Sequence, residues 1–335
     1  MKDEHPVANK FNVFAIIQGG RLQYEAVTFA ATFRHKHPNF KGRLIFGEPQ
    51  HTENWNYDPT IDSDEIRRLL EGFDAEIVPF NNHVFGSDYP YGNKIVGLTA
   101  LPKGEPFIFF DTDTLFTGRL NEVDFDFDRP AASMRRTNTW PEIDLYGPGY
   151  ADTWKSLYDK FDLDFEKSLD MTKPDEYWER YMYFNAGWFF YKCPHEFADH
   201  FLNYATEIMR DPPYEVCTQE FNPWLDQVAL PLVISKLGGG RPTESQLQLD
   251  GEVACHYRTL PLLYARESDE AIDALERAVA PNKIKKVMKK SEAYRKLVFQ
   301  RKGTEIIREM FDRDNLPRKE QAIRQRIKKR NLWLR

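Results

Sequence analysis

Two aspartates follow the most apolar segment of the chain, and their spacing is suited to holding a cation. Residues 106–110 read Pro-Phe-Ile-Phe-Phe, and Asp111-Thr112-Asp113 comes directly after them. On extended backbone, side chains two residues apart point to the same side, so the two carboxylates would repel one another unless a cation lies between them. Carboxylate oxygens favour a hard ion such as Mg²⁺ or Mn²⁺, which usually completes its shell with substrate phosphates. The alternative is a pair of solvated loop acids.

The elements before these acids predict a parallel sheet that would carry them at its edge. Short apolar runs alternate with segments of helical periodicity. Strands are predicted over 11–17, 43–46, 75–80 and 106–110, and helices over 22–36, 62–73 and 93–101. This β-α order indicates an α/β, Rossmann-like fold with helices on both faces of the sheet. Such sheets bind ligands outside the carboxyl ends of their strands.

The second half of the chain is less regular. A strand is predicted over 183–191, and helices over 197–209, 224–237 and 269–280. The helix over 224–237 is expected to break near Pro231, because the residue before a proline resists the α conformation. Residues 246–257 predict a β-hairpin, since Asp250-Gly251 suits a two-residue turn. The remaining tail, residues 283–335, is mostly helix-forming.

Four motifs in this order resemble those of GT-A-fold glycosyltransferases, and the family 8 type is closest in pattern. They are Asp111-Thr112-Asp113, Tyr183-Phe184-Asn185-Ala186-Gly187, Asp226-Gln227 and Cys255-His256-Tyr257. The sequence departs from the pattern where Gln18-Gly19-Gly20 replaces the usual Thr/Asp that contacts the base. It departs again after His256, where the family's Gly and Lys-Pro-Trp are missing. The resemblance implies a GT-A catalytic domain over residues 1–262 and a helical, basic C-terminal extension over residues 263–335.

The resemblance further implies a metal-dependent transferase of the hexosyltransferase type. Asp111, Asp113 and His256 would hold Mn²⁺ or Mg²⁺, and two oxygens with one nitrogen suit Mn²⁺ better. The ion would offset the charge that develops on the departing nucleoside diphosphate. The alternative for His256 is an ordinary histidine at a strand end.

Substrate contacts also come from the resemblance. Asp226 is implied as the catalytic residue, with a helix N-terminal acid as its structural alternative. Lys94 precedes the metal strand and could reach a phosphate, or be a solvated lysine. Arg135 and Arg136 could face the diphosphate or an anionic acceptor, or form a surface pair. The implied substrate-binding residues are Gln18, Gly19, Lys94, Asp111, Thr112, Asn185 and Gln227.

Composition indicates a globular cytoplasmic protein. The chain has 335 residues, of which 41% are hydrophobic and 14% aromatic, and disordered chains are poor in aromatics. No segment approaches the roughly 18 apolar residues that span a bilayer. The residues after Met1 lack the apolar region of a secretory signal. Three widely spaced cysteines argue against a disulfide framework and fit a reducing compartment.

Charge divides the chain into an acidic body and a basic tail. Residues 281–335 contain 19 Lys/Arg and 6 Asp/Glu, a balance of +13, which leaves −19 for the body and −6 overall. One hypothesis places residues 283–335 on an anionic membrane, at its inner face, where a lipid-linked or envelope glycan acceptor would be met. The competing hypothesis is that the tail packs on the acidic body. The acidic body argues against nucleic acid as a partner. The favoured donor is a UDP-sugar.

Two other functions compete with glycosyl transfer. Asp111 and Asp113 also resemble the nucleophile motif of the haloacid-dehalogenase phosphatases, which are Mg²⁺-dependent. In that family the motif lies on the first strand and Gly-Thr follows it, whereas here three βα units precede it and Thr114-Leu115 follows it. A non-catalytic membrane-surface adaptor with a degenerate GT-A fold is the second alternative.

Overall fold

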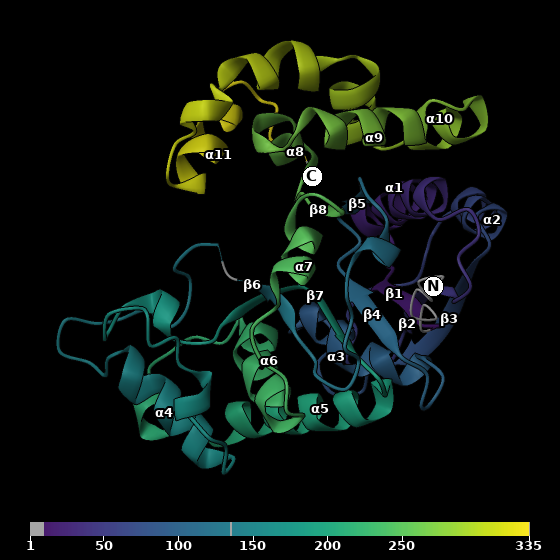
Figure 1. Cartoon of the computed structure of the whole chain (residues 1–335). Coiled ribbons are helices and arrows are strands. Elements are labelled where there is room, and N and C mark those ends of the chain that lie inside the picture. The colour runs from purple at the N-terminus through teal and green to yellow at the C-terminus, as the bar shows by residue number, and fades with distance from the viewer. Residues whose placement is uncertain (1–9, 135, 335) are drawn as a thin grey trace, which may run out of the picture.

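A six-stranded sheet forms the centre of the computed structural model, which describes residues 10–134 and 136–334 (Figure 1). Within those residues the strand order is β3-β2-β1-β4-β7-β6. The first four strands pair in parallel, while β7 runs antiparallel to both β4 and β6. The bounds are β1 Asn12–Ile16, β2 Leu44–Gln50, β3 Ala75–Asn81, β4 Phe107–Phe110, β6 Ala132–Met134 and β7 Phe184–Tyr191. The predicted α/β fold and its mostly parallel sheet are confirmed.

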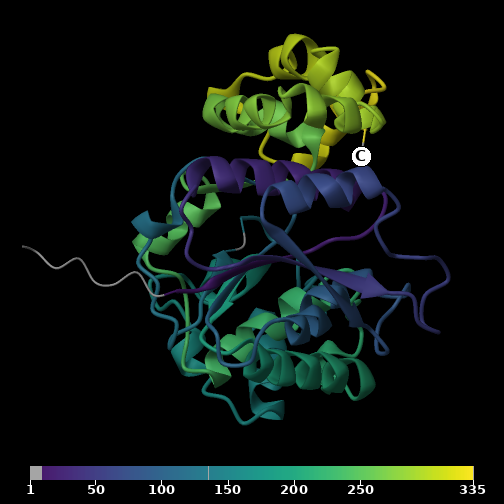
Figure 2. The ribbon, with the colours of Figure 1, turned by 90° about the vertical axis from the view of Figure 1, so that its right-hand side faces the viewer.

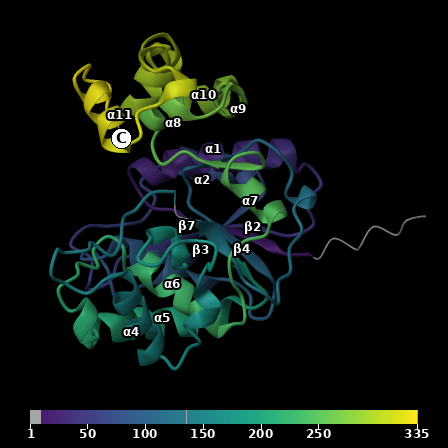
Figure 3. The same ribbon diagram turned by 60° about the vertical axis from the view of Figure 1, so that its left-hand side comes forward.

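Helices cover both faces of this sheet, and its central strands β1 and β4 are therefore buried throughout. One face carries α1 and α2, and the other carries α3, α5 and α6 (Figures 1 and 3). The bounds are α1 Arg21–Lys36, α2 Asp64–Gly72, α3 Asn93–Val96, α4 Tyr150–Lys160, α5 Pro194–Arg210 and α6 Leu225–Lys236. The α1 helix begins where β1 ends, so its N-terminus lies at the same edge of the sheet as Asp111.

The predicted break near Pro231 is wrong, because α6 continues through this residue. A proline inside a helix removes one backbone hydrogen bond and costs about 3 kcal/mol. Most apolar side chains of α6 are fully buried, and each contributes about 1.5–3 kcal/mol. Packing therefore outweighs the local preference of the backbone.

The predicted hairpin over residues 246–257 is also wrong. Its first half is helical, in α7 (Glu244–Leu247) and the 3₁₀ turn after it, because Thr243 and Gln246 form a reciprocal capping box. The second half forms β8 (Ala254–His256), which pairs antiparallel with β5 (Thr114–Phe116). In that register His256 lies opposite Thr114, and this places the histidine beside the acidic motif.

The C-terminal helices form a further layer above α1 and α2 (Figure 2). They are α8 Leu260–Arg266, α9 Asp269–Val279, α10 Asn282–Met288 and α11 Glu320–Lys328, with two π-helical segments between α10 and α11. The helix predicted over 269–280 is present as α9, and Ser268 caps it by accepting from the backbone N–H of Ala271. Apolar side chains of this layer, such as Met288 and Leu297, belong to the same core cluster as α1 and β1. Among the described residues, no helix is long and apolar enough to cross a membrane.

Candidate active site

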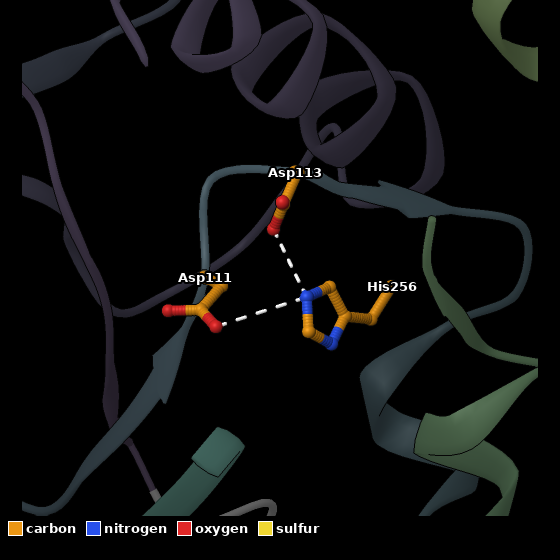
Figure 4. Close-up of side chains that lie close together, drawn as sticks. All are labelled: Asp111, Asp113 and His256. Carbon is orange, nitrogen blue, oxygen red and sulfur yellow. Dashed lines mark ion pairs between the residues drawn. The ribbon is translucent and has the colours of Figure 1, made fainter. Parts of the chain in front are cut away.

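Asp111, Asp113 and His256 converge at the carboxyl end of β4 (Figure 4). One ligand atom from each side chain can be chosen so that all lie within 4.8 Å of one another. Nε2 of His256 lies 3.0 Å from Oδ1 of Asp113 and 3.7 Å from Oδ2 of Asp111. The side chains of Asp111, Asp113 and His256 are 26%, 12% and 13% exposed, so each is only partly accessible to solvent. Two carboxylate oxygens and an imidazole nitrogen at this spacing fit a divalent ion such as Mn²⁺.

Gly187 on β7 lets the imidazole approach the sheet. A Cβ built on this glycine would lie 2.4 Å from Nδ1 of His256 and 2.9 Å from Oδ1 of Asn185. The backbone of Gly187 also makes two hydrogen bonds in the site. Its carbonyl accepts from the N–H of Asp111 at 2.9 Å, and its N–H donates to Oδ1 of Asn185 at 2.8 Å. Any side chain at residue 187 would therefore push His256 away from the aspartates.

Asn185 holds this turn with both ends of its amide. Besides accepting from Gly187, it donates from Nδ2 to the carbonyl of Met134 at 3.3 Å. Ala186, the next residue, has a φ of 55°, which is uncommon for a residue with a side chain. The structure thus gives Asn185 a role in positioning Gly187, and its contact with substrate stays a prediction.

Two buried or half-buried cations flank the acids. Nζ of Lys94 on α3 lies 3.1 Å from Oδ1 of Asp111 and 3.1 Å from Oδ2 of Asp226. On the other side of the acids, the guanidinium of Arg21 at the start of α1 lies 3.6 Å from Oδ2 of Asp113 and 2.7 Å from Oε1 of Glu25. Both cations therefore lie beside the carboxylates of the triad.

These charges act on the ionisation of the aspartates. Burial works to raise the pKa of Asp113, but His256 and Arg21 outweigh it and lower that pKa to about 2. Burial raises the pKa of Asp111, and Lys94 and His256 only partly oppose it. For Lys94, burial would lower the pKa, but the carboxylates of Asp111 and Asp226 outweigh it and raise the pKa.

Asp226 is enclosed more completely than the other acids of the site. It is 1% exposed, its Oδ1 accepts from the hydroxyl of Tyr89 at 2.7 Å, and its Oδ2 is paired with Lys94. Its neighbour Gln227 accepts from the hydroxyl of Tyr183 through Oε1 at 3.0 Å. This arrangement favours a positioning role for Asp226, which fixes Lys94 beside Asp111.

The remaining predicted residues lie at the carboxyl ends of β1 and β4. Nε2 of Gln18 is buried and has no hydrogen-bond partner among the described residues, so this donor is available to a ligand. Gly19 is packed tightly, since a Cβ there would lie 2.7 Å from the carbonyl oxygen of Thr60. Thr112 is buried between the two aspartates in the sequence.

The predicted arginine pair is placed only in part. Arg136 donates from its guanidinium to the carbonyl of Asp250, whose carboxylate accepts from Ser133 and Trp188. Arg136 therefore stabilises the segment before β8. Arg135 lies outside the described residues.

Sequence reasoning missed Arg21, Tyr89 and the structural use of Gly187. Arg21 follows two glycines at the end of a predicted strand, and this position at a ligand-binding edge was a usable indication. Tyr89 is 137 residues from Asp226 in the sequence, and no local pattern reveals their hydrogen bond.

The chain matches the family model described as the Rhodobacterales glycosyltransferase domain over residues 13–238. This range includes both aspartates of the motif, Lys94 and Asp226, and it ends before His256. It spans well over half of the chain. No curated protein matches the chain significantly.

Among solved structures, the chain is similar to an active-site mutant of LgtC, with 15% identity, a TM-score of 0.44, and coverage of 70% of this chain and 73% of that one. It is similar to the galactosyltransferase LgtC in complex with donor and acceptor sugar analogues, with 14% identity, a TM-score of 0.40 and the same coverage. The apo-form glycosyltransferase GlyE of Streptococcus pneumoniae is 12% identical over 70% of this chain and 46% of that one, with a TM-score of 0.38. By its family match and its sheet, the chain belongs to the Rhodobacterales glycosyltransferase domain family and is a glycosyltransferase with a GT-A fold.

Proposed function

We propose that this glycosyltransferase is metal-dependent and takes its sugar from a nucleotide-sugar donor, with a UDP-sugar favoured. The observation that carries the proposal is the convergence of Asp111, Asp113 and His256, whose ligand atoms lie within 4.8 Å. The acids come from one loop and the histidine from β8, far along the chain, so the cluster is a tertiary feature and not a run of neighbouring polar residues.

A divalent ion bound there supplies Lewis-acid stabilisation of the departing diphosphate. Asp111, Asp113 and His256 would hold the ion, and the pKa of Asp113, lowered to about 2, keeps that carboxylate ionised at neutral pH. Lys94 and Arg21 add two positive charges beside the acids. They reduce the electrostatic cost of bringing a diphosphate next to the carboxylates of Asp111 and Asp113.

The roles on the sugar side remain proposals from the sequence. The resemblance implies Asp226 as the catalytic residue and Asn185 and Gln227 as substrate-binding residues. Asp226 supports catalysis by holding Lys94, since both of its oxygens are already engaged. The unpartnered amide of Gln18 is a candidate contact for the donor.

Neither of the competing functions is retained. The haloacid-dehalogenase phosphatase and the non-catalytic adaptor both give way to the family match, which makes the chain a glycosyltransferase. The acceptor, as a glycan or a lipid-linked glycan, stays a prediction, and so does the cytoplasmic location at the inner face of the membrane. Some cations of the tail are engaged within the molecule, such as Lys290 with Glu65 and Arg308 with Asp269.

Metal removal and replacement test the proposal. The purified protein is stripped with EDTA, and release of nucleoside diphosphate from UDP-, GDP- and CDP-sugars is measured with and without added Mn²⁺ or Mg²⁺. Binding of Mn²⁺ is measured separately by electron paramagnetic resonance. We expect no turnover in the stripped protein and recovery with Mn²⁺. Undiminished turnover after stripping would contradict the proposal.

Variants of the histidine add a residue-specific test. His256→Ala is expected to weaken Mn²⁺ binding, and His256→Asp to restore part of it, because a carboxylate can replace the nitrogen ligand. Asp152→Asn, an exposed acid on α4, serves as the control and keeps wild-type Mn²⁺ affinity. Equal Mn²⁺ affinity in all of these proteins would exclude His256 as a ligand.

A further inference from the structure

A cavity of about 160 Å³ lies between the N-terminus of α1 and the C-terminal layer. Gly20, Arg21, Tyr24 and Glu25 line it from the side of the catalytic core. The cavity adjoins the metal triad, because Arg21 both lines it and lies 3.6 Å from Oδ2 of Asp113. A ligand at the triad would therefore have this cavity as its neighbour.

Two buried polar atoms of the cavity walls have no protein partner among the described residues. They are Oε2 of Glu25 and Oγ1 of Thr259, in side chains whose residues are 2% and 6% exposed. Thr259 stands at the N-cap position of α8, yet its hydroxyl does not cap that helix. Buried polar atoms are nearly always hydrogen-bonded, so these two indicate a ligand that carries its own donors and acceptors.

The C-terminal layer supplies the opposite wall, with Ser291, Ala293, Tyr294 and Leu334. This wall is fixed to the core, since the hydroxyl of Tyr294 lies 3.2 Å from Oγ1 of Thr28 on α1. The rings of Tyr24 and Tyr294 lie 6.5 Å apart, and together they give the cavity aromatic surface. Aromatic surface with a few polar atoms suits a flat heterocycle better than a sugar or a phosphate.

We propose that this cavity receives the base of the nucleotide donor, so that the C-terminal extension forms one wall of the donor site. The inference rests on the proposed function, in which the triad takes the diphosphate. The cavity is open beside Gly20, because a Cβ built on this lining residue would meet no atom within 4 Å. The volume suits one planar ring, with the ribose and diphosphate outside it and directed past Arg21 to the triad. The extension then acts in donor binding, whatever else its positive charge does.

Calorimetric titration of the full chain separates the base from the diphosphate. The probes are UDP, GDP and CDP, and inorganic pyrophosphate, each with Mn²⁺. Ser291→Phe fills the cavity from the side of the extension, and Gln300→Phe, exposed on the same extension and outside the cavity, is the matched control. We expect Ser291→Phe to raise the dissociation constant of the nucleoside diphosphate that the wild type binds most tightly by about tenfold or more. The affinity for pyrophosphate should stay as in the wild type. Gln300→Phe should match the wild type for both.

Thr259→Val removes the unpartnered hydroxyl without changing the volume of the cavity. We expect it to weaken binding of the same nucleoside diphosphate by roughly threefold and to leave the affinity for pyrophosphate unchanged. Nucleotide affinity that is unaltered in both Ser291→Phe and Thr259→Val, or lost equally for nucleotide and pyrophosphate, would overturn the inference. If the wild type binds pyrophosphate but no nucleotide, the base pocket fails while the metal site stands. If the wild type binds neither, the proposed function itself fails.

Discussion

The carboxyl end of β4 and the opposite end of the sheet both bury ionisable groups, but the group at the first end is charged and the group at the second is neutral. At the carboxyl end, Asp113 is held ionised, with His256 and Arg21 within 4 Å. At the opposite end, His37 follows the last turn of α1 beside a cavity of about 520 Å³. Burial lowers the pKa of His37 to about 4, so the ring is neutral at neutral pH. Charge is kept where opposite charges outweigh desolvation, as at Asp113, and it is lost at His37, where burial outweighs the nearby carboxylate of Glu122.

Hydrogen bonds complete the contrast. Nδ1 of His37 donates to the carbonyl of Phe33 at 2.9 Å, and Nε2 accepts from the N–H of Leu120 at 2.8 Å. Its ring stacks on Phe33, with centroids 4.6 Å apart. Every polar atom of this ring is thus used by the fold. At the other end, Nε2 of Gln18 and Oε2 of Glu25 are buried without a partner among the residues described. These unpartnered atoms near the triad are available to a ligand, whereas the polar atoms of the His37 ring are not.

The largest effect is expected from an aspartate of the triad. Asp113→Asn removes a charged ligand, and we expect turnover to fall by roughly 10³-fold, because a bound metal contributes several kcal/mol to the transition state. The fold should survive with a modest loss of stability, since asparagine keeps the shape of Asp113 but gives up its ion pairs with His256 and Arg21. Steady-state kinetics and urea unfolding measure the two effects. A protein that turns over normally would show that the charged end of the sheet is not the catalytic end.

Removal of Lys94 should be the most destabilising change at the charged end. Lys94→Met leaves the buried carboxylates of Asp111 and Asp226 without their shared cation, and breaking such a pair costs about 3–5 kcal/mol. The double variant with Asp226→Asn should recover part of this loss, because one unpaired charge is removed. Urea unfolding gives both values. A loss under about 1 kcal/mol for Lys94→Met would mean that water screens this site as it does a surface pair.

The sequence predicted the charged end of the sheet better than it predicted the second half of the chain. The βα units and the position of the aspartates at the end of β4 follow from local periodicity. The strands β1 and β4 are almost entirely apolar, so the sequence predicts them clearly as buried strands. The interval 246–257 misled the prediction because Gln246-Leu247-Gln248-Leu249 alternates like a strand, whereas the capping box of Thr243 selects a helix. Position 256 was flagged by resemblance, but its pairing opposite Thr114 is a tertiary fact that no local pattern contains.

The residues that tune the site were the hardest to foresee. The sequence leaves Lys94 as either a phosphate contact or a solvated lysine, and in the structure it is buried and bridges Asp111 and Asp226. The contacts of Arg21 with Asp113 and of Tyr89 with Asp226 join residues 92 and 137 positions apart in the sequence. Such contacts depend on how the strands are ordered in the sheet, and the sequence gives that order only in part.

The smallest effect tests the neutral end, through the pH dependence of stability. His37 has a folded pKa of about 4 against an ordinary value of 6.5, so the unfolded chain binds a proton first as the pH falls. The stability that neutral His37 provides is complete above pH 6.5 and is lost progressively as the pH falls toward 4. Between pH 7 and pH 5 the free energy of unfolding should decrease by about 2 kcal/mol from this group alone.

Urea unfolding at the two pH values isolates that contribution when variants are compared. His37→Gln should be less stable than the wild type at pH 7, because it loses the stacked ring, but it should lose about 2 kcal/mol less than the wild type on going to pH 5. His51→Gln, at an exposed histidine, should keep the wild-type dependence on pH. If His37→Gln and the wild type lose the same free energy, then His37 takes up its proton over the same pH range in the folded and unfolded chains, and its pKa is not lowered by the fold. The contrast between the two ends of the sheet would then be wrong.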